Sequence, residues 1–255
     1  MAFDLITVPC LSDNYAFLLR DHDSGKVAVI DVPEAAPILA ALKDRGWEPS
    51  QIWLTHHHDD HVQGLEEVLE SYDANVIGGK ADAHRLPGLD RMVEEGDSIN
   101  LGALEAHVVE VPGHTAGHIA FYVPGASAAF TADSLMALGC GRLFEGTPAQ
   151  MWDSMQKMMK WPGETTICSG HEYTASNAKF ALTVDPDNPD LISRVEEVEA
   201  ARKAGQSTVP SQLSTEMKTN PFLRVADPDI RAHLGMQTST DTEVFAEIRK
   251  RKDKF

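Results

Sequence analysis

Histidine and aspartate side chains are concentrated in one short run of this 255-residue chain, between Thr55 and His61. Four side chains of the run are suited to bind a metal ion: His56, His58, Asp60 and His61. The residues before the run, Gln51–Leu54, are mainly apolar and predict a strand. A strand that ends in alternating imidazole and carboxylate groups directs several ligands toward one point. We therefore predict a metal site at this loop.

Three further candidate ligands also follow predicted strands. His114 follows Leu104–Val111, Asp133 follows Ala128–Thr131, and His171 follows Thr165–Cys168. In α/β sheets, ligands converge at the carboxyl ends of the strands. A single histidine or aspartate at such a place is more often a core, surface or turn residue, so these three depend on the Thr55–His61 run for support.

The seven residues divide into the ligands of two metal ions. A tetrahedral site that keeps one open, water-bearing position needs three protein ligands. One predicted set is His56, His58 and His114, and the other is Asp60, His61 and His171. Asp133 remains, and its two carboxylate oxygens can bridge the ions. We predict two divalent ions that activate a shared water molecule, with Asp60 and Asp133 assigned to catalysis as well as to metal binding.

The metal itself is not fixed by these ligands, because zinc, iron and manganese all accept imidazole and carboxylate groups. We expect zinc, with iron or manganese as alternatives. His57 and Asp59 alternate away from the ligand face, and we interpret them as spacers or as partners that orient the ligands. His118 opens a predicted strand, and we interpret it as structural.

The charge and the cysteines limit the class of protein. Asp and Glu number 39 against 22 Lys and Arg, which gives a formal charge of −17. Such a surface repels nucleic acid and anionic membranes, so we expect neither as a partner. The three cysteines, Cys10, Cys140 and Cys168, are too sparse for a disulfide framework. No apolar run approaches the roughly 20 residues needed to span a bilayer, and the amino terminus shows no secretory signal pattern, so we expect a cytoplasmic protein. We also expect a monomer.

The pattern along the chain predicts a mixed α/β catalytic domain over residues 1–172 and a small helical domain over residues 173–255. Three short strands begin the chain, so its first sheet is not purely parallel. Helices are predicted at Glu34–Arg45, which Gly46 ends, and at Val62–Tyr72. Beyond Cys168 no strong strand signal occurs. Helices are predicted there at Asn177–Thr183, Leu191–Ala204, Asp227–His233 and Asp241–Lys252.

The spacing His56-x-His58-x-Asp60-His61, followed in order by His114, Asp133 and His171, resembles the metallo-β-lactamase superfamily. The resemblance implies an αβ/βα sandwich, in which two mixed sheets are flanked by helices and the metals lie at one edge. It does not fix the substrate, because one fold hosts many activities.

Several local motifs narrow the resemblance to glyoxalase II, the hydroxyacylglutathione hydrolases. These motifs are Val8–Tyr15, Phe130–Leu135, Gly139–Thr147, Gly170–Thr174, Asn220–Arg224 and Lys252–Phe255. The resemblance implies hydrolysis of an S-(2-hydroxyacyl)glutathione thioester, such as S-D-lactoylglutathione, to glutathione and a 2-hydroxy acid. That reaction is the second step of methylglyoxal detoxification.

The same resemblance implies which residues hold the glutathione part of the substrate. The matching positions are Arg142, Tyr173, Arg249 and Lys252. Phe144 stands where many members carry a tyrosine, which puts one hydrogen bond of about 1 kcal/mol in doubt.

Three alternatives to this function remain: a persulfide-dioxygenase-like enzyme with one iron on the same fold, a metal-dependent nuclease or phosphodiesterase, and a non-catalytic metal-binding module. The acidic charge argues against the nuclease.

Overall fold

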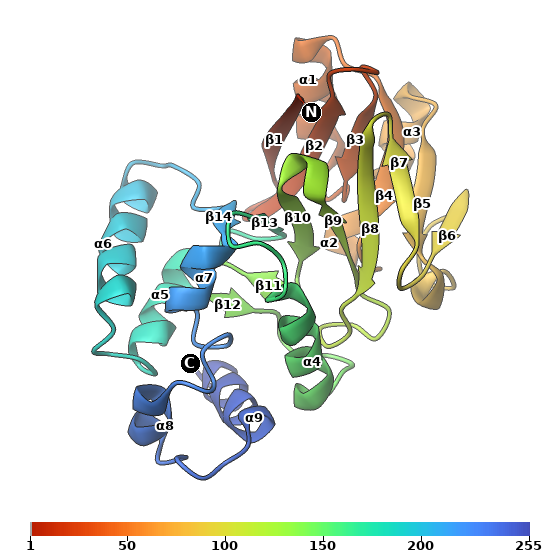
Figure 1. Cartoon of the computed structure of the whole chain (residues 1–255). Coiled ribbons are helices and arrows are strands. Elements are labelled where there is room, and N and C mark those ends of the chain that lie inside the picture. Colours follow the sequence, from red (N-terminus) through yellow and green to blue (C-terminus); the bar gives the residue numbers. More distant parts are fainter. Residues whose placement is uncertain (1) are drawn as a thin grey trace. The chain divides into compact units, whose positions relative to one another are not determined.

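The computed structural model describes residues 2–255 (Figure 1). Its strands are β1 Phe3–Cys10, β2 Asn14–Asp21, β3 Val27–Ile30, β4 Pro49–Leu54, β5 Asn75–Gly79, β6 Arg91–Val93, β7 Ser98–Leu101, β8 Leu104–Glu110, β9 Ile119–Val123, β10 Ala128–Ala132, β11 Leu135–Met136, β12 Gly139–Cys140, β13 Thr166–Ser169 and β14 Ser211–Gln212. Its α-helices are α1 Ala35–Arg45, α2 Asp59–Val62, α3 Leu65–Ser71, α4 Pro148–Met158, α5 Thr174–Leu182, α6 Pro189–Lys203, α7 Leu213–Thr219, α8 Pro228–Leu234 and α9 Asp241–Lys252. Short 3-10 turns lie at Lys80–Asp82 and Pro124–Ala126.

Two six-stranded sheets account for most of the strands. The first has the order β1-β2-β3-β4-β5-β6, and the second has the order β14-β13-β10-β9-β8-β7. In the first sheet β1, β2 and β3 pair antiparallel, whereas β3, β4, β5 and β6 pair parallel. The prediction that this sheet is not purely parallel is therefore confirmed. Strands β11 and β12 form a separate two-stranded hairpin.

The chain divides into two compact units. One comprises the residues up to Glu110 together with Ala116–Ala132, and the other comprises Val111–Thr115 together with Asp133–Phe255. In the first unit, helices α1 and α3 bury Ile38, Leu42 and Val68 against one face of the first sheet. The sheet residues of this core alternate along β4, where Ile52 and Leu54 face the helices.

The opposite face of the first sheet packs on strands β9 and β10. Trp53 lies between Ile52 and Leu54 and therefore points the other way. Its ring centroid is 5.2 Å from that of Phe121 and 6.4 Å from that of Phe130. The Phe17 ring of β2 also packs on Phe130, at 5.7 Å. This aromatic layer fixes β4, and with it the starting point of the Thr55–His61 run.

The second unit contains most of the helices. Helices α4 and α9 pack through Trp152 and Phe245, whose ring centroids are 5.9 Å apart. Phe222 connects this pair to α5, since it lies 5.5 Å from Phe245 and 6.2 Å from Phe180. Helix α9 begins with a capping box between Thr240 and Glu243, as its sequence favours. In the chain from residue 2 to 255, no helix combines the length and the apolar character needed to cross a membrane.

Several sequence predictions differ from these elements. The helix expected at Val62–Tyr72 begins only at Leu65, because the Gly64 N–H donates to the Val32 carbonyl at 2.9 Å and not to a carbonyl one helical turn earlier. Although the sequence shows no strong strand signal beyond Cys168, strand β14 forms there and pairs with β13. Strand β14 has two residues, which are too few to give a periodic signal. Helix α7 was not predicted either. By contrast, Gly46 ends α1 in the left-handed conformation, as predicted.

Candidate metal centre

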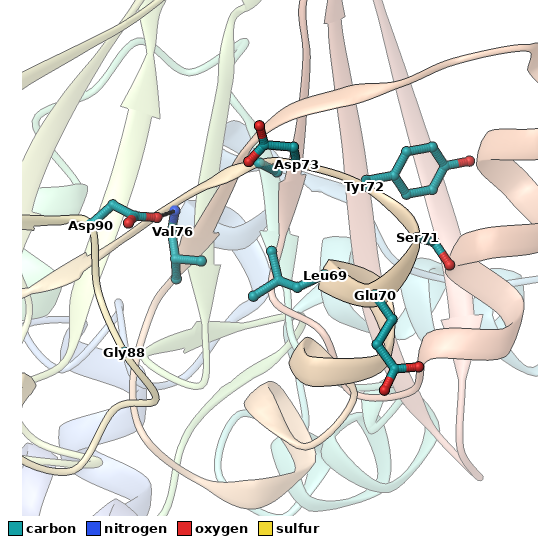
Figure 2. A pocket seen from close by; sticks show the side chains of 9 residues that line it. Leu69, Glu70, Ser71, Tyr72, Asp73, Val76, Gly88 and Asp90 are labelled. Atoms are coloured by element: carbon teal, nitrogen blue, oxygen red, sulfur yellow. Dashed lines mark hydrogen bonds between the residues drawn. The ribbon is translucent and has the colours of Figure 1, made fainter.

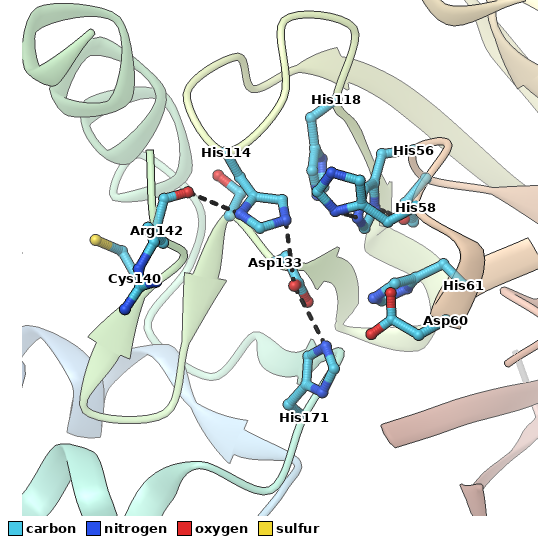
Figure 3. A network of polar contacts seen from close by, with 12 residues as sticks. His56, His58, Asp60, His61, His114, His118, Asp133, Cys140, Arg142 and His171 are labelled. Carbon is cyan, nitrogen blue, oxygen red and sulfur yellow. Dashed lines mark hydrogen bonds and ion pairs between the residues drawn. The ribbon is translucent and has the colours of Figure 1, made fainter. Parts of the chain in front are cut away.

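Four predicted ligands lie together in the first unit, at the end of β4 and in the short helix α2 (Figure 3). The Nε2 atom of His56 is 3.2 Å from the Nδ1 atom of His58. The ligand atoms of His56 and His61, and those of Asp60 and His61, lie within 4.8 Å of each other. His56 and His61 are fully buried. The loop thus gathers four metal-binding side chains from six consecutive positions.

Asp31 orients two of these histidines and was missed by the sequence analysis. Its buried carboxylate accepts a hydrogen bond from His61 Nδ1 at 2.8 Å and from the Thr55 hydroxyl at 2.8 Å. That hydroxyl oxygen is in turn 3.0 Å from His56 Nδ1. Because both Nδ1 atoms donate protons toward Asp31, both Nε2 atoms keep their lone pairs for a metal. Asp31 directly follows β3, so the signal that found the other ligands could have found it.

Other side chains of the first unit hold the loop in place. The Asn14 amide donates to the Asp60 backbone oxygen at 2.9 Å and to its carboxylate at 3.1 Å. His57 Nδ1 lies 3.0 Å from the carboxylate of the buried Asp82, and its ring is 4.9 Å from the His58 ring, while Asp59 is exposed. His118 stacks on the His56 ring, with centroids 4.6 Å apart.

The other three predicted ligands lie together in the second unit. Asp133 Oδ2 is 3.4 Å from His114 Nε2 and 3.3 Å from His171 Nε2, so one carboxylate oxygen stands between two imidazoles (Figure 3). All three residues are buried. His114 Nδ1 donates to the Arg142 carbonyl at 2.8 Å, which leaves its Nε2 lone pair for a metal. Gly141 permits this approach, because a Cβ there would lie 1.9 Å from the Asp133 carbonyl oxygen.

The donor atoms fit metal binding within each cluster. Two nitrogen or oxygen ligands on one tetrahedral ion, each at about 2.05 Å, lie about 3.3 Å apart. The His56–His58 separation and both Asp133 separations have this value within 0.1 Å. Each of the seven predicted ligands belongs to a group of histidines and carboxylates that could hold a metal ion.

Two of the four predicted substrate-binding residues are exposed in the second unit. The Tyr173 ring is 41% exposed and stacks on the His171 ring at 4.6 Å, with an angle of 6° between the planes. The Arg142 side chain is 59% exposed and lies 3.7 Å from the Asp253 carboxylate. Phe144 is also exposed, and its ring is 5.3 Å from that of His114.

The other two predicted substrate-binding residues have internal partners. Arg249 is buried, and it donates to the Cys140 carbonyl at 2.9 Å and to the Asp253 carboxylate at 2.8 Å. Lys252 Nζ lies 3.2 Å from the Ser176 hydroxyl and over the Phe180 and Phe255 rings. Burial, and then the nearby positive charge of Arg249, lower the pKa of Lys252 to about 8.

A surface hollow elsewhere in the first unit has different chemistry. It lies beside the end of α3 and is lined by Glu70, Asp73 and Asp90 among others (Figure 2). Asp90 already accepts the backbone N–H of Val76 at 2.8 Å. Its lining contains no histidine, so it lacks the ligand pattern of the two clusters.

Comparison with known proteins identifies the family. Residues 12–171 match the model of the metallo-β-lactamase superfamily, and residues 172–255 match the model of the hydroxyacylglutathione hydrolase C-terminus. The chain is 60% identical to a hydroxyacylglutathione hydrolase of Roseobacter denitrificans and 61% identical to one of Cereibacter sphaeroides, over the full length of each. This chain belongs to the hydroxyacylglutathione hydrolase family.

A solved structure supports the fold of this family member. ETHE1 from Myxococcus xanthus covers 98% of the chain, with 90% of its own length, a TM-score of 0.69 and 22% identity. That likeness concerns the fold alone. Together with the family models, it confirms the predicted metallo-β-lactamase fold followed by a helical C-terminal segment.

Proposed function

We propose that this chain hydrolyses S-(2-hydroxyacyl)glutathione thioesters, typified by S-D-lactoylglutathione, to glutathione and a 2-hydroxy acid. The substrate class is supported by the full-length similarity to hydroxyacylglutathione hydrolases. The hydrolytic chemistry is supported by one observation above all, which is the Asp133 oxygen shared between two histidine nitrogens. A carboxylate oxygen in this position can bridge two ions. Two histidines and one carboxylate are also the ligands of single-iron sites, so the number of ions per chain separates this proposal from the one-iron alternative.

The proposed centre holds two divalent ions, with zinc expected and iron or manganese as alternatives. Its ligands are His56, His58, Asp60, His61, His114, Asp133 and His171. Bound there, the ions would supply a hydroxide nucleophile near neutral pH and would polarise the thioester carbonyl. Asp60 and Asp133 are the proposed catalytic carboxylates.

The protein's own residues orient the histidines of this centre. Asp31 accepts from His61 Nδ1 and, through the Thr55 hydroxyl, holds His56 Nδ1, so the Nε2 atom of each ring is left for an ion. The Arg142 carbonyl does the same for His114. Asn14 fixes the Asp60 carboxylate. A glutathione thiolate needs little protonation on leaving, since thiol pKa values lie near 8.5, so no separate general acid is required.

Arg142, Tyr173, Arg249 and Lys252 are the proposed ligands of the glutathione part. Arg249 directs its Nε and Nη2 atoms to one oxygen of Asp253, Oδ1, at 3.0 and 2.8 Å. A substrate carboxylate that binds these two donors would therefore compete with Asp253. Lys252 adds an ammonium group whose pKa is lowered to about 8, so most of its charge is present at neutral pH.

We also propose a domain boundary, a cellular compartment and an oligomeric state for this chain. Residues 1–172 would carry the metal ligands and residues 173–255 the last helix with its basic residues, a boundary that the two family models support. Cys10, Cys140 and Cys168 are free and buried, and burial raises the pKa of the first two to about 11. Protonated, unpaired thiols suit the reducing cytoplasm. We propose a cytoplasmic monomer, which sedimentation can test.

A comparison of two thioesters tests the function. The metal-loaded protein should release glutathione and D-lactate in equal amounts from S-D-lactoylglutathione. It should hydrolyse a lactoyl thioester of a simple thiol far more slowly. Metal analysis of the same sample should find two ions per chain. Absence of turnover with two ions bound would overturn the proposal, and oxygen consumption with glutathione persulfide would favour the dioxygenase alternative.

A further inference from the structure

The hairpin formed by β11 and β12 connects two parts of the second cluster, which consists of His114, Asp133 and His171. Asp133 lies two residues before it, and Arg142, whose carbonyl orients His114, lies two residues after it. At its base, the Gly141 N–H donates to the Ser134 carbonyl at 3.1 Å. A shift of the hairpin would therefore move the Asp133 carboxylate and the His114 ring together.

The turn of this hairpin does not hold itself in shape. Its two central residues are Ala137 and Leu138, and Leu138 has a φ of 56°. The left-handed region is unfavourable for a leucine, since its Cβ crowds the backbone. Such a residue persists only where the surroundings determine its conformation. Contacts outside the hairpin must supply this constraint.

Three buried side chains from the helical segment supply it. Asn220 donates to the carbonyls of Met136 and Gly139, at 3.1 and 3.0 Å. The Glu216 carboxylate accepts the Leu138 N–H at 2.8 Å. The Asn177 amide donates to the Ala137 carbonyl at 3.0 Å. Every residue from 136 to 139 thus has a backbone group bound by one of these side chains, which we call the hairpin clamp.

The clamp is itself held in one arrangement. Glu216 is fully buried, and its charge is balanced by the buried Arg194, which also donates to the Thr219 hydroxyl at 2.6 Å. The Asn220 amide also lies 3.2 Å from Glu216. A buried ion pair contributes little net stability, but its fixed geometry can specify one conformation. Asn220 therefore presents its donors in a single orientation.

We propose that the hairpin clamp, Asn177, Glu216 and Asn220, positions the Asp133 carboxylate and, through the Arg142 carbonyl, the His114 ring. These are positioning residues and do not touch the substrate. The proposal rests on the proposed function in that Asp133 and His114 are taken as metal ligands. It gives the helical segment a second role beside glutathione binding, which is to set the geometry of the metal centre.

Asn220→Ala tests the clamp, with Asp227→Ala as its control. Asp227 caps α8 and pairs with Arg224, so its loss costs stability without touching the hairpin. Asn220→Ala should weaken metal binding about 10- to 100-fold, as is typical for residues that orient ligands, measured by competition with a chelator. It should change the visible spectrum of the cobalt-loaded protein and lower kcat with KM nearly unchanged. Asp227→Ala should lower only the melting temperature.

The outcomes separate the two proposals. If folded Asn220→Ala keeps the wild-type metal affinity and cobalt spectrum, or if Asp227→Ala loses them equally, the clamp is overturned. If Asn220→Ala does not fold, Asn177→Ala decides, with an expected loss of about three- to tenfold in metal affinity for its single hydrogen bond. Unchanged affinity in that variant also overturns the clamp. If the wild type binds metal without cleaving a thioester, the proposed function fails while the affinity comparison still decides the clamp.

Discussion

Asp133 Oδ2 lies within 3.4 Å of two imidazole nitrogens that belong to different strand ends. A carboxylate in this position can tie two ions together, which no other side chain of the second cluster can do. Asp133→Ala should therefore lose at least one ion and lower kcat more than 100-fold, as measured by metal analysis and thioester assay. Asp59→Ala removes an exposed aspartate next to the ligands. This variant should keep both ions and the wild-type kcat. Full turnover of Asp133→Ala with two ions would refute the bridging role.

A substitution at Phe144 should increase the affinity for the substrate. Its ring is exposed and lies next to His114, and many members of the family carry a tyrosine at this position. Phe144→Tyr should lower KM for lactoylglutathione about two- to fivefold, because a neutral hydrogen bond contributes about 1 kcal/mol or less at an exposed site. KM for a thioester without glutathione should stay unchanged. An equal change for both thioesters would show that the hydroxyl does not act on glutathione.

The proposed role of Lys252 predicts that substrate binding depends on pH. Its pKa is lowered to about 8 by burial, so its positive charge is present below pH 8 and is lost above it. KM for lactoylglutathione should therefore rise between pH 7 and pH 9. Lys252→Arg keeps its charge over this range and should flatten the profile, while Lys252→Ala should give a high KM at every pH, with kcat little changed. A wild-type profile as flat as that of Lys252→Ala would contradict the role.

At the scale of elements, the loop after β3 supports the loop after β4. Asp31 receives three hydrogen bonds from that loop, one from the Thr55 N–H and one each from the Thr55 hydroxyl and His61. Asp31→Asn should weaken metal binding about 10- to 100-fold, because an amide no longer fixes the histidine protons. Asp21→Asn is a matched control, since Asp21 is also buried and accepts backbone N–H groups but touches no ligand. Equal losses in both variants would reduce Asp31 to a structural role.

The regular elements followed from local patterns. Helix α9 begins and ends where predicted, because Thr240 and Glu243 form a capping box and basic residues fill the last turn. The strand predicted at Ala128–Thr131 forms as β10 and ends one residue later, at Ala132. The missed elements, β14 and α7, are short. Their formation depends on pairing with β13 and on burial of Glu216, neither of which leaves a periodic pattern.

At the scale of the whole molecule, bound ions should stabilise the folded state. A ligand at 100 times its Kd contributes about 2.7 kcal/mol. For a chain of this size, that corresponds to about 5–10 °C in melting temperature. Adding a chelator should lower the calorimetric Tm by this amount, and adding zinc should restore it. The effect should be much smaller in Asp133→Ala. A Tm that does not respond to the chelator would argue against tightly bound ions.

The sequence by itself determined the chemistry of the candidate ligands and the strands that carry them. Ligand identity is a property of residue type, and the strand before each ligand has an apolar run that can be read locally. Only the tertiary structure decided how those ligands are oriented. Asp31 meets His61 across 30 positions, and Glu216 and Asn220 meet the β11–β12 hairpin across 78 to 84 positions. Hydrogen bonds at such separations depend on chain packing, which local periodicity does not record.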